Sequence, residues 1–152
     1  MNRYKLIQLT NTAVPAVDAD QLLPLGTVTR RLNATTCNAD TFQVASSLAD
    51  TIYINEPGYY KITYSATLTA AGAGLVGVSL IVNNNAVYTV AEEATAAEDI
   101  VNITLPYIIR VCPNSCATPY NCPTSIQLKL GDVAIGTTPS PSSANLIVEK
   151  VY

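Results

Sequence analysis

The four cysteines are the residues whose type and spacing best suit chemistry. Three lie in the stretch CPNSCATPYNC and one lies far upstream: Cys112, Cys116, Cys122 and Cys37. Zinc sites usually contain C-x2-C pairs, and without histidine every ligand here would be a cysteine. In an oxidising medium, four cysteines could form disulfides in three pairings. Disulfides, free thiols and a metal site remain open, and we favour a disulfide within the loop, with Cys37 free or bridged to it.

A second candidate for chemistry is the acidic stretch VAEEATAAED, residues 90–99, which holds Glu92, Glu93, Glu98 and Asp99. Its helix formers would suit a short helix, and its carboxylates would suit a cation site. Loops that bind hard cations usually alternate Asp or Asn with other residues and contain a turning glycine, and this stretch has neither feature. We therefore expect a solvated connecting loop.

Catalysis has little support in the remaining residues. The chain has no histidine, the usual base at neutral pH, and neither a glycine-rich phosphate loop nor a Gly-x-Ser-x-Gly turn. Neighbouring acids on one segment do not give the opposed carboxylates, about 5 to 10 Å apart, that glycoside hydrolysis needs. We predict that the protein is not an enzyme and uses no cofactor or metal.

Strands are the elements that must position these residues. The stretch IYINEPGYYKITYSATL, residues 52–68, alternates with a period of two on both sides of the corner Glu56-Pro57-Gly58. Proline fixes φ at the first turn position, and glycine tolerates a positive φ at the second. The pattern predicts a strand over 52–55 and another over 59–69. The second strand would place one row of side chains in the core: Tyr60, Ile62, Tyr64, Ala66 and Leu68.

Similar patterns recur along the chain. Residues 75–82 and 86–90 flank the turn Asn83-Asn84-Asn85 and predict a hairpin, because asparagine tolerates the left-handed region. Residues 100–111 place Leu105 and Tyr107 on the apolar face, and Pro106 on the other face predicts a sheet edge or a bulge. Residues 125–130 and the last residues alternate again. We predict an antiparallel β-sandwich or jelly roll.

The composition limits the partners. Charged residues make up 12% of the chain, about half the usual ~25%. A surface with so few charges is expected when copies of a chain cover one another. The net charge of −3 argues against nucleic acid, and no apolar run is long enough to cross a membrane. The first residues lack the continuous apolar region of a signal peptide, so we expect no export signal.

The stretch IYINEPGYYKITYSATLT resembles the signature of the C1q/TNF-like jelly roll, as do LGDVAI at residues 130–135 and the final SSANLIVEKVY. The resemblance covers about residues 40–152. It implies a homotrimer in which three domains pack around an axis, with aromatic and aliphatic residues of one sheet facing the partners. Under this interpretation the core or the trimer axis is packed by Tyr60, Ile62, Tyr64, Leu68, Leu105 and Tyr107.

The stretch AVPAVDADQLLPLGTVTRRLN, residues 13–33, resembles the segment before C1q/TNF-like domains in surface proteins of Gram-positive bacteria and virion proteins of their phages. We therefore predict an arm over residues 1–33 and a jelly-roll domain over 34–152. The arm would bind the major capsid protein or another virion protein through Leu6, Ile7, Leu9, Leu22, Leu23, Arg30 and Arg31. Equally open is that this segment adds an edge strand to its own sandwich.

A structural virion protein of a tailed phage, a trimeric capsid decoration or head fibre on the capsid surface, is the function that the resemblance favours. The absence of a collagen-like Gly-x-y repeat argues against a spore-surface glycoprotein. The alternatives are a spore or cell-surface structural protein and a receptor-binding tip that binds host-surface glycan. Such a tip would use Tyr120, Asn114 and Asn121.

Overall fold

The computed structural model is an all-β sandwich whose described residues are 4–32, 35–36, 39–44, 50–112, 124–137 and 141–152. Its strands are β1 (Leu6–Val14), β2 (Thr27–Leu32), β3 (Thr35–Thr36), β4 (Ala39–Asp40), β5 (Phe42–Val44), β6 (Ile52–Ile54), β7 (Gly58–Thr69), β8 (Gly74–Val82), β9 (Asn85–Ala94), β10 (Ile100–Val111), β11 (Thr124–Leu130) and β12 (Ser142–Lys150). The described part of the chain contains no helix, and hence none that could span a membrane.

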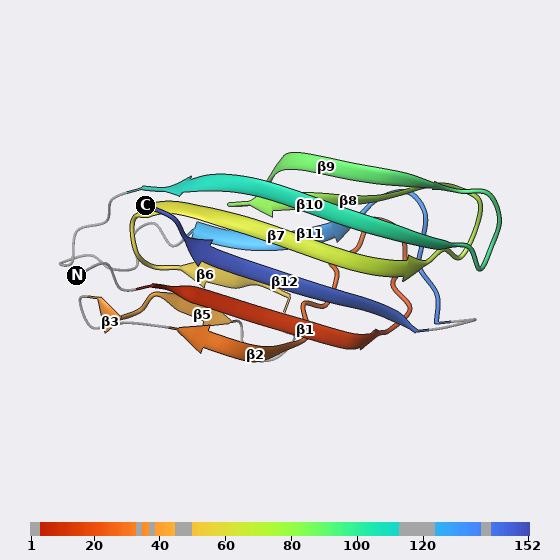
Figure 1. Cartoon of the computed structure of the whole chain (residues 1–152). Coiled ribbons are helices and arrows are strands. Elements are labelled where there is room, and N and C mark those ends of the chain that lie inside the picture. The colour runs from red at the N-terminus through yellow and green to blue at the C-terminus, as the bar shows by residue number, and fades with distance from the viewer. Residues whose placement is uncertain (1–3, 33–34, 37–38, 45–49, 113–123, 138–140) are drawn as a thin grey trace.

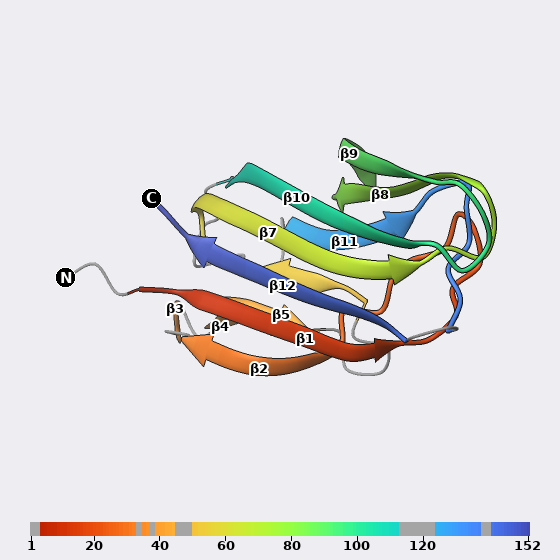
Figure 2. The same ribbon diagram turned by 45° about the vertical axis from the view of Figure 1, so that its right-hand side comes forward.

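Two five-stranded antiparallel sheets form the layers of the sandwich (Figures 1 and 2). We call the sheet with strand order β10-β7-β12-β1-β2 the inner sheet, and the sheet with order β5-β6-β11-β8-β9 the outer sheet. Strands β3 and β4 pair separately. The start of β1 and the end of β12 lie at the same end of the sandwich (Figure 1), which we call the terminal end.

The core lies between the two sheets because each long strand turns alternate side chains inward. In β7 the inward row is buried and the outward row is largely exposed, as the period of two predicted. Tyr60, Tyr64 and Phe42 are the largest fully buried side chains. The rings of Phe42 and Tyr60 meet edge to face, with centroids 5.9 Å apart, an arrangement that aromatic pairs favour.

The predicted hairpin is confirmed. Strands β8 and β9 pair over their length, and the turn residues Asn83 and Asn84 have φ values of 51° and 66°. Positive φ at both central positions is typical of the tight turns that join antiparallel strands. The predicted edge is also confirmed, because β10, which contains Pro106, is the last strand of the inner sheet.

The prediction of a separate arm over residues 1–33 is wrong for its described part. Strand β1 lies between β12 and β2 in the inner sheet, and Ile7 pairs with Val148 while Leu9 pairs with Leu146. The apolar alternation of β1 matches the inward row of β12, so pairing within the chain buries both rows. The alternative, in which this segment completes its own sandwich, is correct, and β2 is the edge strand.

The acidic stretch also differs from the predicted loop. Residues 90–94 belong to β9 and pair with β8, so the cross-strand ladder overrides their helix propensity. A turn follows, in which the Asp99 carboxylate accepts hydrogen bonds from the Thr95 amide at 2.7 Å and the Thr95 hydroxyl at 2.6 Å. These bonds lower the pKa of Asp99.

Candidate functional site

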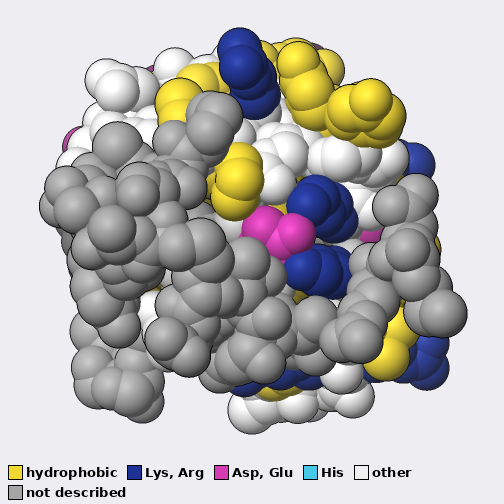
Figure 3. Space-filling model, turned by 90° about the vertical axis from the view of Figure 1, so that its left-hand side faces the viewer, with side chains coloured by type: hydrophobic (Ala, Val, Ile, Leu, Met, Phe, Trp, Pro, Cys, Tyr) yellow, Lys and Arg dark blue, Asp and Glu magenta, His cyan; other side chains and the backbone are white. Residues whose placement is uncertain are grey.

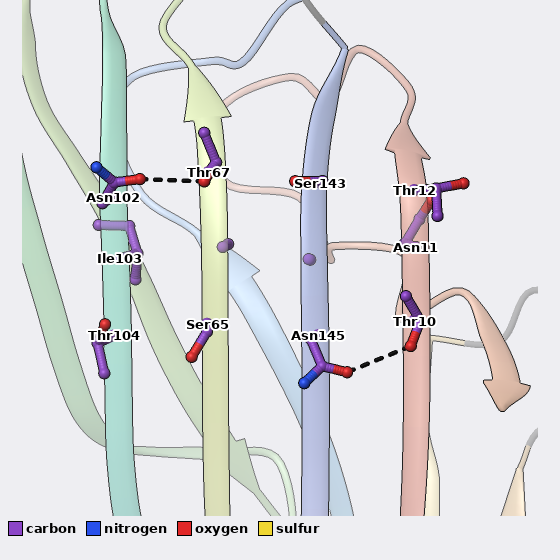
Figure 4. A pocket seen from close by; sticks show the side chains of 12 residues that line it. Thr10, Asn11, Thr12, Ser65, Thr67, Asn102, Ile103, Thr104, Ser143 and Asn145 are labelled. Atoms are coloured by element: carbon purple, nitrogen blue, oxygen red, sulfur yellow. Dashed lines mark hydrogen bonds between the residues drawn. The ribbon is translucent and has the colours of Figure 1, made fainter. Parts of the chain in front are cut away.

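A shallow groove of about 320 Å³ crosses the solvent-facing side of the inner sheet. It runs over β10, β7, β12 and β1 (Figure 4), and its lining residues are uncharged and mostly small: Thr10, Asn11, Thr12, Ser65, Ala66, Thr67, Asn102, Ile103, Thr104, Ser143, Ala144 and Asn145. Neighbouring side chains bond across the strands. The Thr67 hydroxyl donates to Asn102 Oδ1 at 3.0 Å, and the Thr10 hydroxyl donates to Asn145 Oδ1 at 3.3 Å.

The chemistry of this groove suits contact rather than catalysis. Hydroxyl and amide groups can donate and accept hydrogen bonds, and none of the lining residues titrates near neutral pH. Small side chains let another surface approach the sheet closely. The sequence contains part of this groove, because Ser65, Thr67, Ser143 and Asn145 occupy the polar faces of their strands. The sequence alone does not show that β7 and β12 are neighbours.

An aromatic ridge lies at one edge of the same sheet. Tyr107 of β10 stacks on Tyr88 of β9, with ring centroids 5.3 Å apart and an interplanar angle of 23°. Tyr88 is 41% exposed and Val87 beside it is 39% exposed. The edges of the two sheets therefore present an apolar surface at β9 and β10.

The predicted packing residues lie inside the sandwich. Tyr60, Ile62, Tyr64, Leu68 and Leu105 are at most 1% exposed and belong to the core between the sheets, whereas Tyr107 is half-buried. The Tyr60 hydroxyl donates to the Glu56 carbonyl at 2.9 Å. The Tyr64 hydroxyl is buried and finds no hydrogen-bond partner among the described residues. Burial raises the pKa of both tyrosines, and the nearby Glu56 raises that of Tyr60 further.

A partly buried ionic cluster closes the terminal end. The Glu56 carboxylate, 12% exposed, pairs with Lys5, with Lys150 at 2.7 Å and with the Thr41 hydroxyl at 3.0 Å. Burial alone would raise the pKa of Glu56, but the hydrogen bonds from Lys150, Lys5 and Thr41 outweigh it and lower the pKa to about 2. The first strand, the last strand and the corner before β7 are thus tied together.

Comparison with known proteins bears on the fold. No protein-family model and no curated protein matches the chain. Among solved structures, the globular domain of zebrafish complement 1qA protein matches with a TM-score of 0.63 and 9% identity, over 97% of this chain and 98% of its own. Eiger TNF from S. frugiperda matches with a TM-score of 0.64 and 9% identity, over 99% and 94%. The chain has the C1q/TNF-like jelly-roll fold.

The predicted fold class is therefore confirmed. PRD1 vertex protein P5 shares this jelly roll, with a TM-score of 0.62 and 17% identity over 97% of each chain. At such identities the likeness shows the fold alone.

The predicted arm residues have different places in the jelly roll. Ile7, Leu9 and Leu23 are fully buried in the core, and Leu6 and Leu22 are partly buried. Ile7, Leu9 and Leu23 serve the fold, because their side chains belong to the core between the sheets. Arg30 and Arg31 of β2 are exposed.

The remaining predicted sites are only partly described. Cys112 is an exposed free thiol at the end of β10, whereas Cys37, Cys116 and Cys122 lie outside the described residues. The glycan-binding hypothesis rested on Tyr120 and its neighbours, which also lie outside them. Within the described part of the chain, no three Cys, Asp or Glu residues are grouped to hold a metal ion.

Proposed function

We propose that this chain is a non-enzymatic structural protein of a tailed-phage virion, a homotrimeric capsid decoration or head-fibre protein that exposes its jelly roll on the capsid surface. The observation that carries the proposal is the groove on the outward side of the inner sheet, whose lining residues are uncharged and mostly small. The likeness to PRD1 vertex protein P5 supports a place on a virion.

The groove and the aromatic ridge support self-association. They are different surfaces, one a groove lined by uncharged residues, the other an apolar sheet edge around Tyr88 and Val87. Contact between unlike surfaces of identical copies is heterologous, and it closes into a ring when the rotation allows. Three copies is the number that the family resemblance implies. In such a ring the ridge of one copy would lie against the groove of the next.

Attachment to the major capsid protein or another virion protein would use exposed residues. The buried Ile7, Leu9 and Leu23 are occupied by the core, so the arm contact first predicted is not part of this proposal. Arg30 and Arg31 stay available on the edge strand β2.

Light scattering of the purified chain and mass spectrometry of purified phage particles together test the proposal. We expect the mass of three chains, with and without reductant, and the protein in washed particles. A monomer would contradict the assembly part. Recovery from coat extracts of uninfected cells instead of particles would contradict the virion part and favour the spore-surface alternative.

A further inference from the structure

The charged side chains of the sandwich are separated along its strands. At the terminal end, four exposed cations lie on three strands of the inner sheet: Arg30 and Arg31 of β2, Lys61 of β7 and Arg110 of β10. The strand pairing places them at similar positions along the strands, near the terminal end. Arg30 and Arg31 lie opposite Gln8 and Ile7 at the start of β1, and Arg110 lies opposite Tyr59 at the start of β7. Figure 3, which views this end, shows several basic groups and few acidic ones.

These four cations have no ion-pair partner within the described ranges. Two further lysines at this end, Lys5 and Lys150, share the Glu56 carboxylate. Among the described side chains, the other acid at this level is Glu149, which accepts a hydrogen bond from Tyr4. Six cations against two carboxylates leave the described side chains of the terminal end with a net charge of +4.

The opposite end has the reverse balance. Backbone bonds from Asp20 to Gly131 and from Ala70 to Asp99 gather its loops. Its acids are Asp18, Asp20, Glu92, Glu93, Glu98, Asp99 and Asp132, and its single cation among the described residues is Lys129, which pairs with Asp20 at 3.0 Å. Seven acids against one cation leave a net charge of −6.

The charges of the two ends are too far apart to act together on a partner. Ten residues of extended strand β10 separate Arg110 from Ile100, which is about 33 Å. Charges are screened over about 8 Å at physiological salt. An acidic surface that meets the terminal end is therefore not repelled by the far end, although the whole chain has a net charge of −3.

We propose that the terminal end is a docking surface for an acidic protein surface, so that the acidic end points away from the partner. Three of the four exposed cations are arginines, whose planar guanidinium binds carboxylates through paired hydrogen bonds. Four cations spread over about 19 Å, the width of five strands, are too few and too dispersed for the phosphate neutralisation that nucleic-acid binding needs. This inference rests on the proposed virion role for the existence of an acceptor.

The test uses the full chain and immobilised poly-L-glutamate as the acidic probe, with retention measured against salt. We expect the wild-type chain to bind at low salt, and R30Q/R31Q/K61Q/R110Q to bind at least tenfold more weakly. A matched variant adds E92Q/E93Q/E98Q/D132N to these four changes, which restores the net charge of the whole chain. We expect its binding to remain lost, because the charge at the terminal end decides it.

Three results would overturn the docking surface. They are no binding of the wild type, recovery of binding when only the net charge is restored, and tighter binding to duplex DNA or phosphatidylserine vesicles than to poly-L-glutamate. The pair R30E/R31E provides a smaller change if the larger variants do not fold, and it should also lose binding. Light scattering of each variant tests the trimer independently of binding. A wild-type monomer that still binds poly-L-glutamate would refute the trimer but not the docking surface.

Discussion

The Lys150 ammonium lies 2.7 Å from a Glu56 carboxylate oxygen and joins the last strand to the corner that precedes β7. Lys5, 8% exposed, contacts the other oxygen of the same carboxylate from just before β1. A single, partly buried acid thus joins two lysines that are 145 residues apart in sequence.

Replacing Glu56 by glutamine should destabilise the fold by about 3 kcal/mol, because it removes the carboxylate that pairs with the buried Lys5 ammonium and with Lys150. Urea unfolding at neutral pH measures the change. The matched control is Glu93→Gln, which removes an exposed carboxylate without an ion pair in the described structure and should change stability by less than about 0.5 kcal/mol. Equal stability of both variants would show that the cluster contributes nothing.

The same cluster predicts a pH dependence. The folded pKa of Glu56, about 2, lies below its ordinary value of 4.5, so its contribution is complete above pH 4.5 and is lost as the pH falls toward 2. The stability difference between the wild type and Glu56→Gln should therefore shrink across this window. Urea midpoints measured through the window check this, and a constant difference would contradict it.

Two tyrosine-to-phenylalanine changes should have opposite effects. Tyr64→Phe removes a buried hydroxyl that has no partner in the described structure, so stability should stay equal or rise by up to about 1 kcal/mol. Tyr60→Phe removes a hydroxyl that donates to the Glu56 carbonyl at 2.9 Å, and it should cost about 1 kcal/mol. A loss on Tyr64→Phe as large as that on Tyr60→Phe would mean that the Tyr64 hydroxyl is satisfied.

The strands could be predicted from the sequence because their signals are local. The alternation around Tyr60 and Tyr64 and the asparagine turn each lie within a few residues, so strand, turn and inward row follow from periodicity. Residues 90–94 form a strand despite their helix propensity, because their backbone pairs with β8. A propensity counts only local residue preferences and cannot include this partner strand.

The ionic cluster and the groove could not be predicted in the same way. Lys5 and Lys150 lie 51 and 94 residues from Glu56, and no local pattern links them. The groove needs the order of four strands, because β1 and β12 become neighbours only in the folded sheet. The separate-arm interpretation failed for the same reason: Ile7 and Leu9 find their partners at the opposite end of the chain.

Gly58 is expected to be essential at the corner. Its φ is +146°, and a Cβ atom there would lie 2.5 Å from the Tyr152 carbonyl oxygen and 2.6 Å from Lys150 Cε. Gly58→Ala should therefore cost more than about 1 kcal/mol in thermal or urea unfolding. Gly72→Ala is the matched control, because nothing lies within 4 Å of the added methyl group and no positive φ is required. A Gly58→Ala variant as stable as this control would contradict the close approach.

Charges placed in the groove should dissociate the assembly without unfolding the subunit. Ser65 and Ser143 line the groove on the adjacent strands β7 and β12. In S65R/S143R each copy would bring two unpaired charges into the proposed contact, and burial of such charges without partners costs several kcal/mol. Light scattering should then report the mass of a single chain. The urea midpoint of the dissociated domain should equal that of dilute wild type.

The control is Gln43→Arg, which puts a charge on the exposed side of the outer sheet, away from the groove, and should leave the mass unchanged. If S65R/S143R keeps the wild-type mass, the inner sheet does not form the contact, and self-association has to be sought at another surface.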